Sequence, residues 1–162
     1  METIISIKPL LAVLVSLFVI PVLVSSSGKP NVRESWIFVA GAIKLVLVLS
    51  MLPVILGGKQ IVLTLFEIAP GAAIAFRVDG LGMLFAIVAA SLYIVTSIYS
   101  IGYMRGLNEH GQTRFVSFFA LAISATIGAA FSANLLTLYL FYEILSLATY
   151  PLVTHHQDAT SR

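Results

Sequence analysis

The chain has 162 residues, of which 59% are hydrophobic and only 10% are charged, and its mean hydropathy is +1.04. An ordinary soluble domain carries roughly 25% charged residues, so this composition excludes a water-soluble globular domain and indicates a membrane protein. The formal charge of +2 is too small to indicate nucleic-acid binding, and the absence of cysteine excludes disulfides, thiolate metal sites and thiol nucleophiles. A chain this apolar and this short buries little against itself, so we expect it to act inside a complex with other membrane subunits.

Five apolar segments are each long enough to cross a membrane as a helix. They comprise residues 4–24, 36–56, 81–101, 115–133 and 135–153. Each is close to the roughly 20 residues that a helix needs to span about 30 Å of hydrocarbon. The first segment is longer than the apolar part of a signal peptide and no A-x-A cleavage site follows it, so we expect a retained helix.

The segment between the second and third helices predicts a β-hairpin at the membrane surface. Residues 61–66 are rich in strand formers, Pro70 and Gly71 form a turn signal, and residues 73–78 follow. The alternative, a re-entrant helix, would carry three charged side chains into lipid. The sequence therefore predicts an all-α membrane protein of about five transmembrane helices, with a short external β-hairpin between the second and the third.

The fourth apolar segment carries small side chains at every fourth position. Ala120, Ser124, Gly128 and Ser132 lie on one face of the predicted helix. Such a stripe lets another helix approach closely, so we expect a packing surface. The alternative is a hydroxyl-lined ion path through the two serines.

Positive charges are distributed unevenly between the two sides of the predicted membrane. One side carries Lys29, Arg33, Arg105, Arg114 and Arg162, whereas the other carries Lys59, Arg77 and, just inside the first helix, Lys8. By the positive-inside rule, the first side is expected to be cytoplasmic. This orientation places the N-terminus and the hairpin outside and the C-terminal tail inside.

The predicted helices and the hairpin divide the chain into four parts. These are residues 1–57 with the first two transmembrane helices, residues 58–80 with the external hairpin, residues 81–154 with the last three helices, and residues 155–162 as a cytoplasmic tail. No internal repeat relates the later helices to the earlier ones.

Glu143 is the most informative residue, because it lies near the middle of the last apolar segment. It follows Asn134 by nine residues, which places it roughly 13 Å into a helix that begins there. An acidic side chain at that depth costs about 3 kcal/mol on insertion scales and is usually functional. Three hydroxyl side chains share its face at helical spacing, namely Tyr139, Ser146 and Tyr150. We expect a proton site with a hydroxyl relay; the alternative is a structural acid hydrogen-bonded to a neighbouring helix.

Lys44 is the second charge inside an apolar segment. It lies eight residues past Trp36, about 12 Å into the second predicted helix. One interpretation makes it the cation of an ion pair or a proton relay, and the other lets it reach towards a headgroup or a partner subunit. Its depth permits a pair with Glu143, but the sequence does not show whether the two helices touch.

The remaining polar residues predict caps and surface groups. Asp79, followed by Gly80, begins the third helix, where a carboxylate caps the exposed N–H groups. His110 lies in a short loop, and the adjacent His155 and His156 follow the fifth helix and by themselves make a weak metal site. We expect interfacial, proton-accepting histidines and neither a metal nor a cofactor site in this chain. No phosphate loop, nucleophile elbow or catalytic acid pair occurs in the sequence, so we do not expect a hydrolytic enzyme.

Three motifs, which together span much of the chain from Arg77 to Val153, resemble those of a known family. They are FRVDGL at residues 76–81, YSIGYM at residues 99–104 and NLLTLYLFYEI at residues 134–144. In these motifs the chain resembles the N-terminal part of the antiporter-like membrane subunits that respiratory complex I, Mrp-type sodium/proton antiporters and group 4 membrane-bound hydrogenases share. The helix count and the external hairpin fit the same family.

The resemblance implies a role for Glu143. In that family the glutamate of the fifth helix pairs with a lysine on a later helix and takes part in moving protons. Here Tyr142 stands where the family often has tryptophan. The lysine-bearing helices are not among these 162 residues, so we expect either a fragment of a longer product or a split subunit whose partner supplies them. Lys44 matches no family residue.

The implied function is the N-terminal part of a subunit that translocates H⁺, or Na⁺, in a prokaryotic inner-membrane complex. The complex would be a redox-driven pump of the NADH:quinone oxidoreductase or hydrogenase type, or an Mrp-type antiporter. We expect no catalysis by this chain alone. The alternative is a structural membrane scaffold without an ion site.

Overall fold

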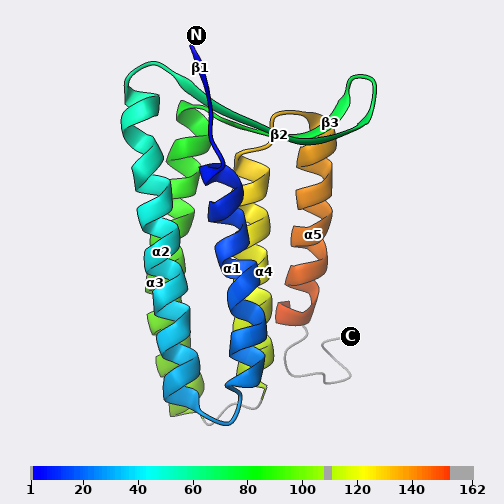
Figure 1. Ribbon diagram of the computed structural model, residues 1–162. Helices are drawn as coiled ribbons and strands as arrows, with labels where there is room; N and C mark the ends of the chain where they lie inside the picture. The colour runs from blue at the N-terminus through cyan, green and yellow to red at the C-terminus, as the bar shows by residue number, and fades with distance from the viewer. Residues whose placement is uncertain (1, 108–110, 154–162) are drawn as a thin grey trace.

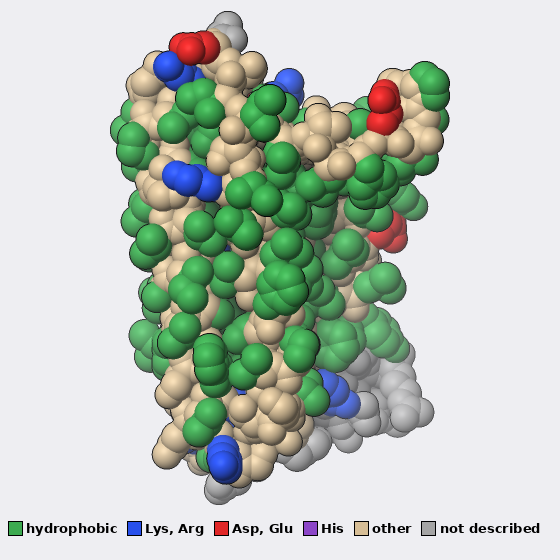
Figure 2. Space-filling view, in the orientation of Figure 1, with side chains coloured by type: hydrophobic (Ala, Val, Ile, Leu, Met, Phe, Trp, Pro, Cys, Tyr) green, Lys and Arg blue, Asp and Glu red, His purple; other side chains and the backbone are tan. Residues whose placement is uncertain are grey.

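The computed structural model describes residues 2–107 and 111–153. In chain order it contains β1 (Thr3–Ile5), α1 (Lys8–Ser25), α2 (Pro30–Leu56), β2 (Gln60–Ala69), β3 (Ala72–Val78), α3 (Gly80–Gly106), α4 (Gln112–Ala130) and α5 (Leu135–Val153). The helices run side by side, and the strands lie across one end of the bundle (Figure 1). All five of these helices are long and apolar enough to cross a membrane. Hydrophobic side chains cover the flank of the bundle seen in Figure 2, with most charges near its two ends, as expected of an integral membrane protein.

The boundaries of the helices differ from the sequence prediction at several ends. The last helix coincides with the predicted 135–153, but α2 begins at Pro30, six residues before the predicted start. The first helix begins at Lys8 because residues 3–5 form β1, so the prediction of helix from residue 4 was wrong at this end. The fourth helix ends at Ala130, because the residues after it pair with β3.

The predicted hairpin is confirmed, within a sheet of the order β1-β2-β3. Strands β2 and β3 are antiparallel, and the turn between them contains Gly71 at φ +81°, a conformation that glycine adopts at little cost. Strand β1 pairs with β2 in parallel, with Ile4 opposite Ile61. This third strand was not predicted, since three residues before an apolar run carry no pattern of their own. That the hairpin is external stays a prediction.

Helix α4 is the centre of the bundle. It packs against α1, α3 and α5, whereas α2 packs against α1 and α3 on the other side. Helix α5 is peripheral and packs mainly on α4 and β3. Only 11% of its apolar window is buried, against 28–39% for the other helices. Most of the surface of α5 therefore faces away from the bundle.

The small-residue stripe of α4 is a packing surface, as predicted. The Ser124 hydroxyl donates a hydrogen bond of 2.6 Å to the Val13 carbonyl of α1. On α5, the Phe141 ring lies directly over Gly128, where a Cβ atom would clash with it. Ser132 lies past the end of α4, and its hydroxyl donates to the Gly128 carbonyl. The stripe thus joins α4 to α1 and to α5.

The end of the bundle opposite the sheet is held by a polar network. The Arg33 guanidinium donates to Thr113 Oγ1 at 3.0 Å and to Gln112 Oε1 at 2.7 Å. The Glu34 carboxylate accepts a hydrogen bond of 2.7 Å from Arg105 Nε. These contacts tie the first turn of α2 to the end of α3 and the start of α4.

Gly128 provides a test of the contact between α4 and α5. We expect Gly128→Ala to destabilise the protein by about 1–3 kcal/mol, because the added methyl group overpacks the Phe141 ring. Gly102→Ala is the matched control, since nothing lies within 4 Å of a Cβ atom at that helical position and alanine favours the helix. The measurement is the thermal unfolding midpoint in detergent. Equal midpoints for the two variants would contradict the proposed packing of α5.

Candidate functional site

Helix α5 is anchored to the sheet at its first turn. The Asn134 side chain accepts a 2.8 Å hydrogen bond from the Thr137 amide through Oδ1, as an N-cap, and donates a 2.7 Å bond to the Ala73 carbonyl through Nδ2. The Thr137 hydroxyl, which is fully buried, accepts a bond of 3.1 Å from the Ala75 amide. Asn134 thus both caps α5 and ties it to β3.

The connection between α4 and α5 pairs with β3 along its backbone. The Ala133 amide donates to the Ala75 carbonyl at 2.9 Å, and the Arg77 amide donates to the Phe131 carbonyl at 2.7 Å. Ser132 forms a β-bridge with Phe76 between these two bonds. The connection therefore behaves as a short extra strand, and the sheet sets where α5 begins.

The inner face of α5 packs on the bundle below this anchor. The Phe141 ring covers Gly128 of α4 and lies 5.6 Å from the Phe76 ring of β3, between centroids. Ala148, two turns further on, is fully buried. These contacts fix the rotation of α5 about its axis, so they decide which side chains point outward.

Glu143 lies on the outward face of α5. It follows Leu135 by eight residues, which is about 12 Å along the helix, and Val153 lies about 15 Å beyond it. Its side chain is exposed at the surface of the bundle. Within the described residues, no hydrogen bond or ion pair reaches its carboxylate. A membrane-embedded carboxylate in that position must meet either lipid or a helix from outside these residues.

The predicted relay residues share this outward face. Tyr139 and Tyr150 are 63% and 66% exposed, and Ser146 is exposed between them. The structure therefore brings all three to the side of α5 that carries Glu143. Their part in proton transfer stays a prediction.

Lys44 lies in the interior of the bundle. It is 14 residues past Pro30 and 12 before Leu56, so it sits about 18 Å from the nearer end of α2, and it is fully buried. Its side-chain nitrogen lies 5.5 Å from the centroid of the Tyr93 ring and has no hydrogen-bond partner within residues 2–107 and 111–153. The structure thus contradicts the interpretation that Lys44 reaches a headgroup or a partner subunit, and it does not pair Lys44 with the outward-facing Glu143.

Other predicted polar residues have simpler positions. The Asp79 carboxylate accepts a 2.8 Å hydrogen bond from the Gly82 amide, so the predicted cap of α3 is confirmed. His110, His155 and His156 lie outside the described residues. Among the residues that are described, no group of three or more metal-ligating side chains comes together.

Ser16 and Tyr93, which the sequence did not single out, are both buried. Tyr93 contacts Lys44, and Ser16 lies on α1 between the same two apolar clusters as Lys44 on α2. In the described part of the chain, neither hydroxyl has a hydrogen-bond partner. The sequence signal was a lone serine in the middle of the first apolar segment, and one tyrosine among several polar side chains of the third. It is weak, because serine and tyrosine are common in membrane helices and either can face lipid headgroups or other helices.

Comparison with known proteins supports the predicted resemblance. Residues 70–116 match the family described as NADH-ubiquinone oxidoreductase (complex I), chain 5 N-terminus. The chain is 29% identical over 83 residues to NAD(P)H-quinone oxidoreductase chain 5 of Picosynechococcus sp., covering 51% of this chain and 12% of the relative. It is 32% identical over 80 residues to the chloroplastic NAD(P)H-quinone oxidoreductase subunit 5 of Adiantum capillus-veneris, covering 49% and 11%.

A third relative is of a different kind. Na⁺/H⁺ antiporter subunit A1 of Staphylococcus aureus (strain bovine RF122) is 31% identical over 80 residues, covering 49% of this chain and 10% of the relative. The chain is thus similar to the N-terminal region of antiporter-like subunits and spans about a tenth of the length of these relatives. The hydrogenase branch stays a prediction, and Glu143 lies beyond the residues that the family matches.

Asn134 provides a test of how α5 is held. We expect Asn134→Ala to destabilise the protein by about 1–2 kcal/mol, because it removes both the cap and the bond to Ala73. Amide hydrogen exchange at Thr137 should become roughly tenfold faster. Asn134→Asp keeps the cap oxygen but not the donor, so it should leave the exchange at Thr137 slow. Equally fast exchange in the two variants would contradict the cap.

Proposed function

We propose that this chain is the N-terminal part of an ion-translocating, antiporter-like subunit of a multisubunit membrane complex, in which Glu143 is a proton site. The observation that carries the proposal is a carboxylate near the middle of α5, on the face that its own bundle leaves uncovered. The similarity to quinone oxidoreductase and antiporter subunits supports it. The proton is the expected ion, with Na⁺ as the alternative.

The position of Glu143 suggests how such a site works. A carboxylate that faces outward receives its partner from another helix, which we expect to carry a lysine. When that cation approaches, it favours the ionised carboxylate, so the proton leaves. When the cation withdraws into another contact, the carboxylate takes up a proton again. The movement of this lysine, which lies outside the chain, thereby makes Glu143 release and take up a proton.

Hydroxyl groups along α5 extend this site in both directions. Tyr139 lies about 6 Å from Glu143 along the helix towards the sheet, while Ser146 and Tyr150 lie about 4.5 and 10.5 Å towards the other end. Hydroxyls can both donate and accept hydrogen bonds, and waters between them complete a chain for proton transfer. The three side chains would then connect Glu143 to both ends of α5.

The two kinds of relative imply two sources of energy. In a quinone oxidoreductase, electron transfer in other subunits would drive the movement of the lysine, whereas in an antiporter the ion gradients would drive this movement. In both, this chain supplies a proton site and other membrane subunits complete the path. The structural alternative gives Glu143 only a hydrogen bond to a neighbouring helix, without proton exchange.

Glu143→Gln separates the proton site from the structural alternative. Glutamine keeps the shape and the hydrogen bonding of the side chain but cannot ionise, so we expect proton transport by the assembled complex to fall by roughly 10²-fold, the range for groups that transfer protons. Glu67→Gln is the control, because that carboxylate is exposed in the hairpin at the end of the bundle. Unchanged transport in correctly assembled Glu143→Gln complexes would refute the proton site.

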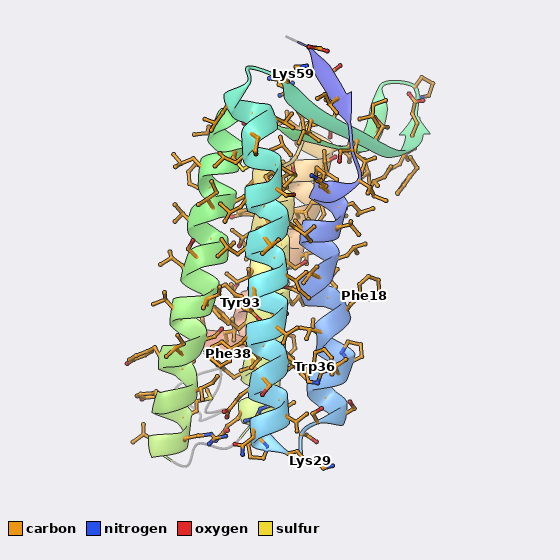
Figure 3. All side chains as sticks on the ribbon, turned by 60° about the vertical axis from the view of Figure 1, so that its left-hand side comes forward. Phe18, Lys29, Trp36, Phe38, Lys59 and Tyr93 are labelled. Atoms are coloured by element: carbon orange, nitrogen blue, oxygen red, sulfur yellow. The ribbon has the colours of Figure 1, made fainter. Side chains whose placement is uncertain are left out.

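We propose that the sheet end of the bundle is outside and the other end cytoplasmic. Lys29 lies at the end opposite to Lys59 and the sheet (Figure 3). Arg33, Arg105 and Arg114 lie in the terminal turns of α2, α3 and α4 at that same end. An excess of cations marks the cytoplasmic side of a membrane protein.

The absence of cysteine from the chain makes this orientation testable. Ala69→Cys places a thiol on the hairpin, and Ser27→Cys places one between α1 and α2; both positions are exposed. We expect a membrane-impermeant maleimide to label Ala69→Cys in intact cells and Ser27→Cys only in inverted vesicles, because the reagent reaches one side at a time. The reverse pattern would invert the orientation.

A further inference from the structure

A layer of polar side chains divides the interior of the bundle. The buried apolar residues form two clusters, one above the other. The cluster near the sheet includes Val13, Val48, Ala90 and Ile127, and the cluster nearer the opposite end includes Val19, Ala40, Tyr93 and Ala120. Each of α1, α2, α3 and α4 therefore contributes to both clusters.

One polar residue per helix lies at the junction of the two clusters. These residues are Ser16 of α1, Lys44 of α2, Tyr93 of α3 and Ser124 of α4. Ser16 lies between Val13 and Val19, and Lys44 lies between Ala40 and Val48. All four are buried to 1% exposure or less. We call them the mid-bundle polar layer.

Three of the four polar groups in this layer are unsatisfied. Ser124 is bonded to the Val13 carbonyl. The hydroxyls of Ser16 and Tyr93 and the nitrogen of Lys44 have no hydrogen-bond partner among the residues that the structure describes. The Lys44 nitrogen lies over the Tyr93 ring, which sits between α3 and α2 (Figure 3). Buried polar groups without partners are costly, so three of them between the same two clusters call for an explanation, either as groups that bind water or as groups with a function.

No acidic group among the described residues faces Lys44. The titratable and charged groups of the packed helices are Lys8 of α1, Arg33 and Glu34 of α2, Tyr93, Tyr99, Tyr103 and Arg105 of α3, and Arg114 of α4. Of these, Tyr93 alone belongs to the layer. Glu34 lies ten residues from Lys44, about 15 Å along α2, and its carboxylate accepts a bond from Arg105. A permanent ammonium at Lys44 would thus lack a counter-ion in this part of the chain.

We propose that Lys44 is a second, internal proton site, which exchanges a proton with water held in the mid-bundle polar layer. In the transfer, one N–H bond of the ammonium breaks and a water oxygen takes the proton, leaving a neutral amine whose lone pair accepts the next proton. The hydroxyls of Ser16 and Tyr93 are positioning groups that hold this water. The site is separate from Glu143, which lies on the outward face of α5.

This site extends the proposed function, and its first test does not depend on transport. The complex is labelled with ¹⁵N at lysine and reconstituted in phospholipid bilayers, and the resonance of the Lys44 nitrogen is identified by its loss in Lys44→Met. We expect this resonance to move between the ammonium and amine positions between pH 5 and pH 10. A resonance that keeps the ammonium position across this range would overturn the proposal.

Stability and transport together give a second test. Methionine matches lysine in length without charge, so Lys44→Met should raise the thermal unfolding midpoint of the complex while lowering proton transport at least about tenfold. Lys59→Met is the matched control, because that lysine lies at the sheet end in a 2.8 Å ion pair with Glu2. A merely structural Lys44 would lower the midpoint when replaced, and an inert one would leave transport unchanged. Either result would refute the site.

Tyr93→Phe probes the layer without removing the amine. Phenylalanine keeps the ring, which stacks on Phe119 at 5.5 Å, but lacks the hydroxyl. We expect a several-fold slower transport with a shifted pH profile. Unchanged transport and an unchanged pH profile would exclude Tyr93 from the site.

The Glu143 and Lys44 variants together separate the internal site from the proposed function. If Glu143→Gln abolishes transport and Lys44→Met does not, the internal site fails while the proposed function stands. If neither variant affects transport, the proposed function fails, and the pH dependence of the Lys44 resonance still decides the internal site.

Discussion

The pairing of the α4–α5 connection with β3 is the constraint on which the outer part of the structure depends. Backbone bonds on both sides of Ser132 and the cap from Asn134 hold the first turn of α5 against the sheet. Because the bilayer core offers no water to backbone groups, a peripheral helix is best anchored at its end, where strands can satisfy it. The contact of Phe141 with Gly128 then sets its rotation. Without these contacts, the outward direction of Glu143 would not be defined.

The two ionisable residues near the middle of the helices, Glu143 and Lys44, lie in opposite environments. Glu143 is exposed on the outer face of α5, so its chemistry depends on a neighbouring helix, whereas Lys44 is fully buried inside the bundle against Tyr93 of α3. Charges at such depth are expensive and are generally kept for ion pathways. A proton site at an interface responds to movements of a partner, and a site in the interior responds to the hydration of the bundle. The protonation of Glu143 and that of Lys44 would therefore depend on different changes in the complex.

Much of the fold could be predicted because a helix that crosses the membrane must be apolar and about 20 residues long. The length of each apolar segment gave the helices, the turn at Pro70 and Gly71 gave the hairpin, and Asp79 and the stripe through Ser124 gave a cap and a packing face. The strand β1 escaped prediction, because its pairing with β2 is made by residues almost 60 positions apart. The burial of Lys44 could not be predicted either, since an apolar segment shows the depth of a residue but not which face of its helix is packed against other helices.

The sequence by itself determined that this is a membrane protein of five apolar helices with a hairpin, and that residues 143 and 44 carry charge at depth. Hydrophobic length and local turn chemistry are enough for that, because they act within one segment. Only the tertiary structure decided that Glu143 points outward and that Lys44 meets Tyr93 and shares a layer with Ser16. Those facts depend on the rotation of each helix, which is set by contacts between distant segments such as Phe141 with Gly128 and Asn134 with Ala73.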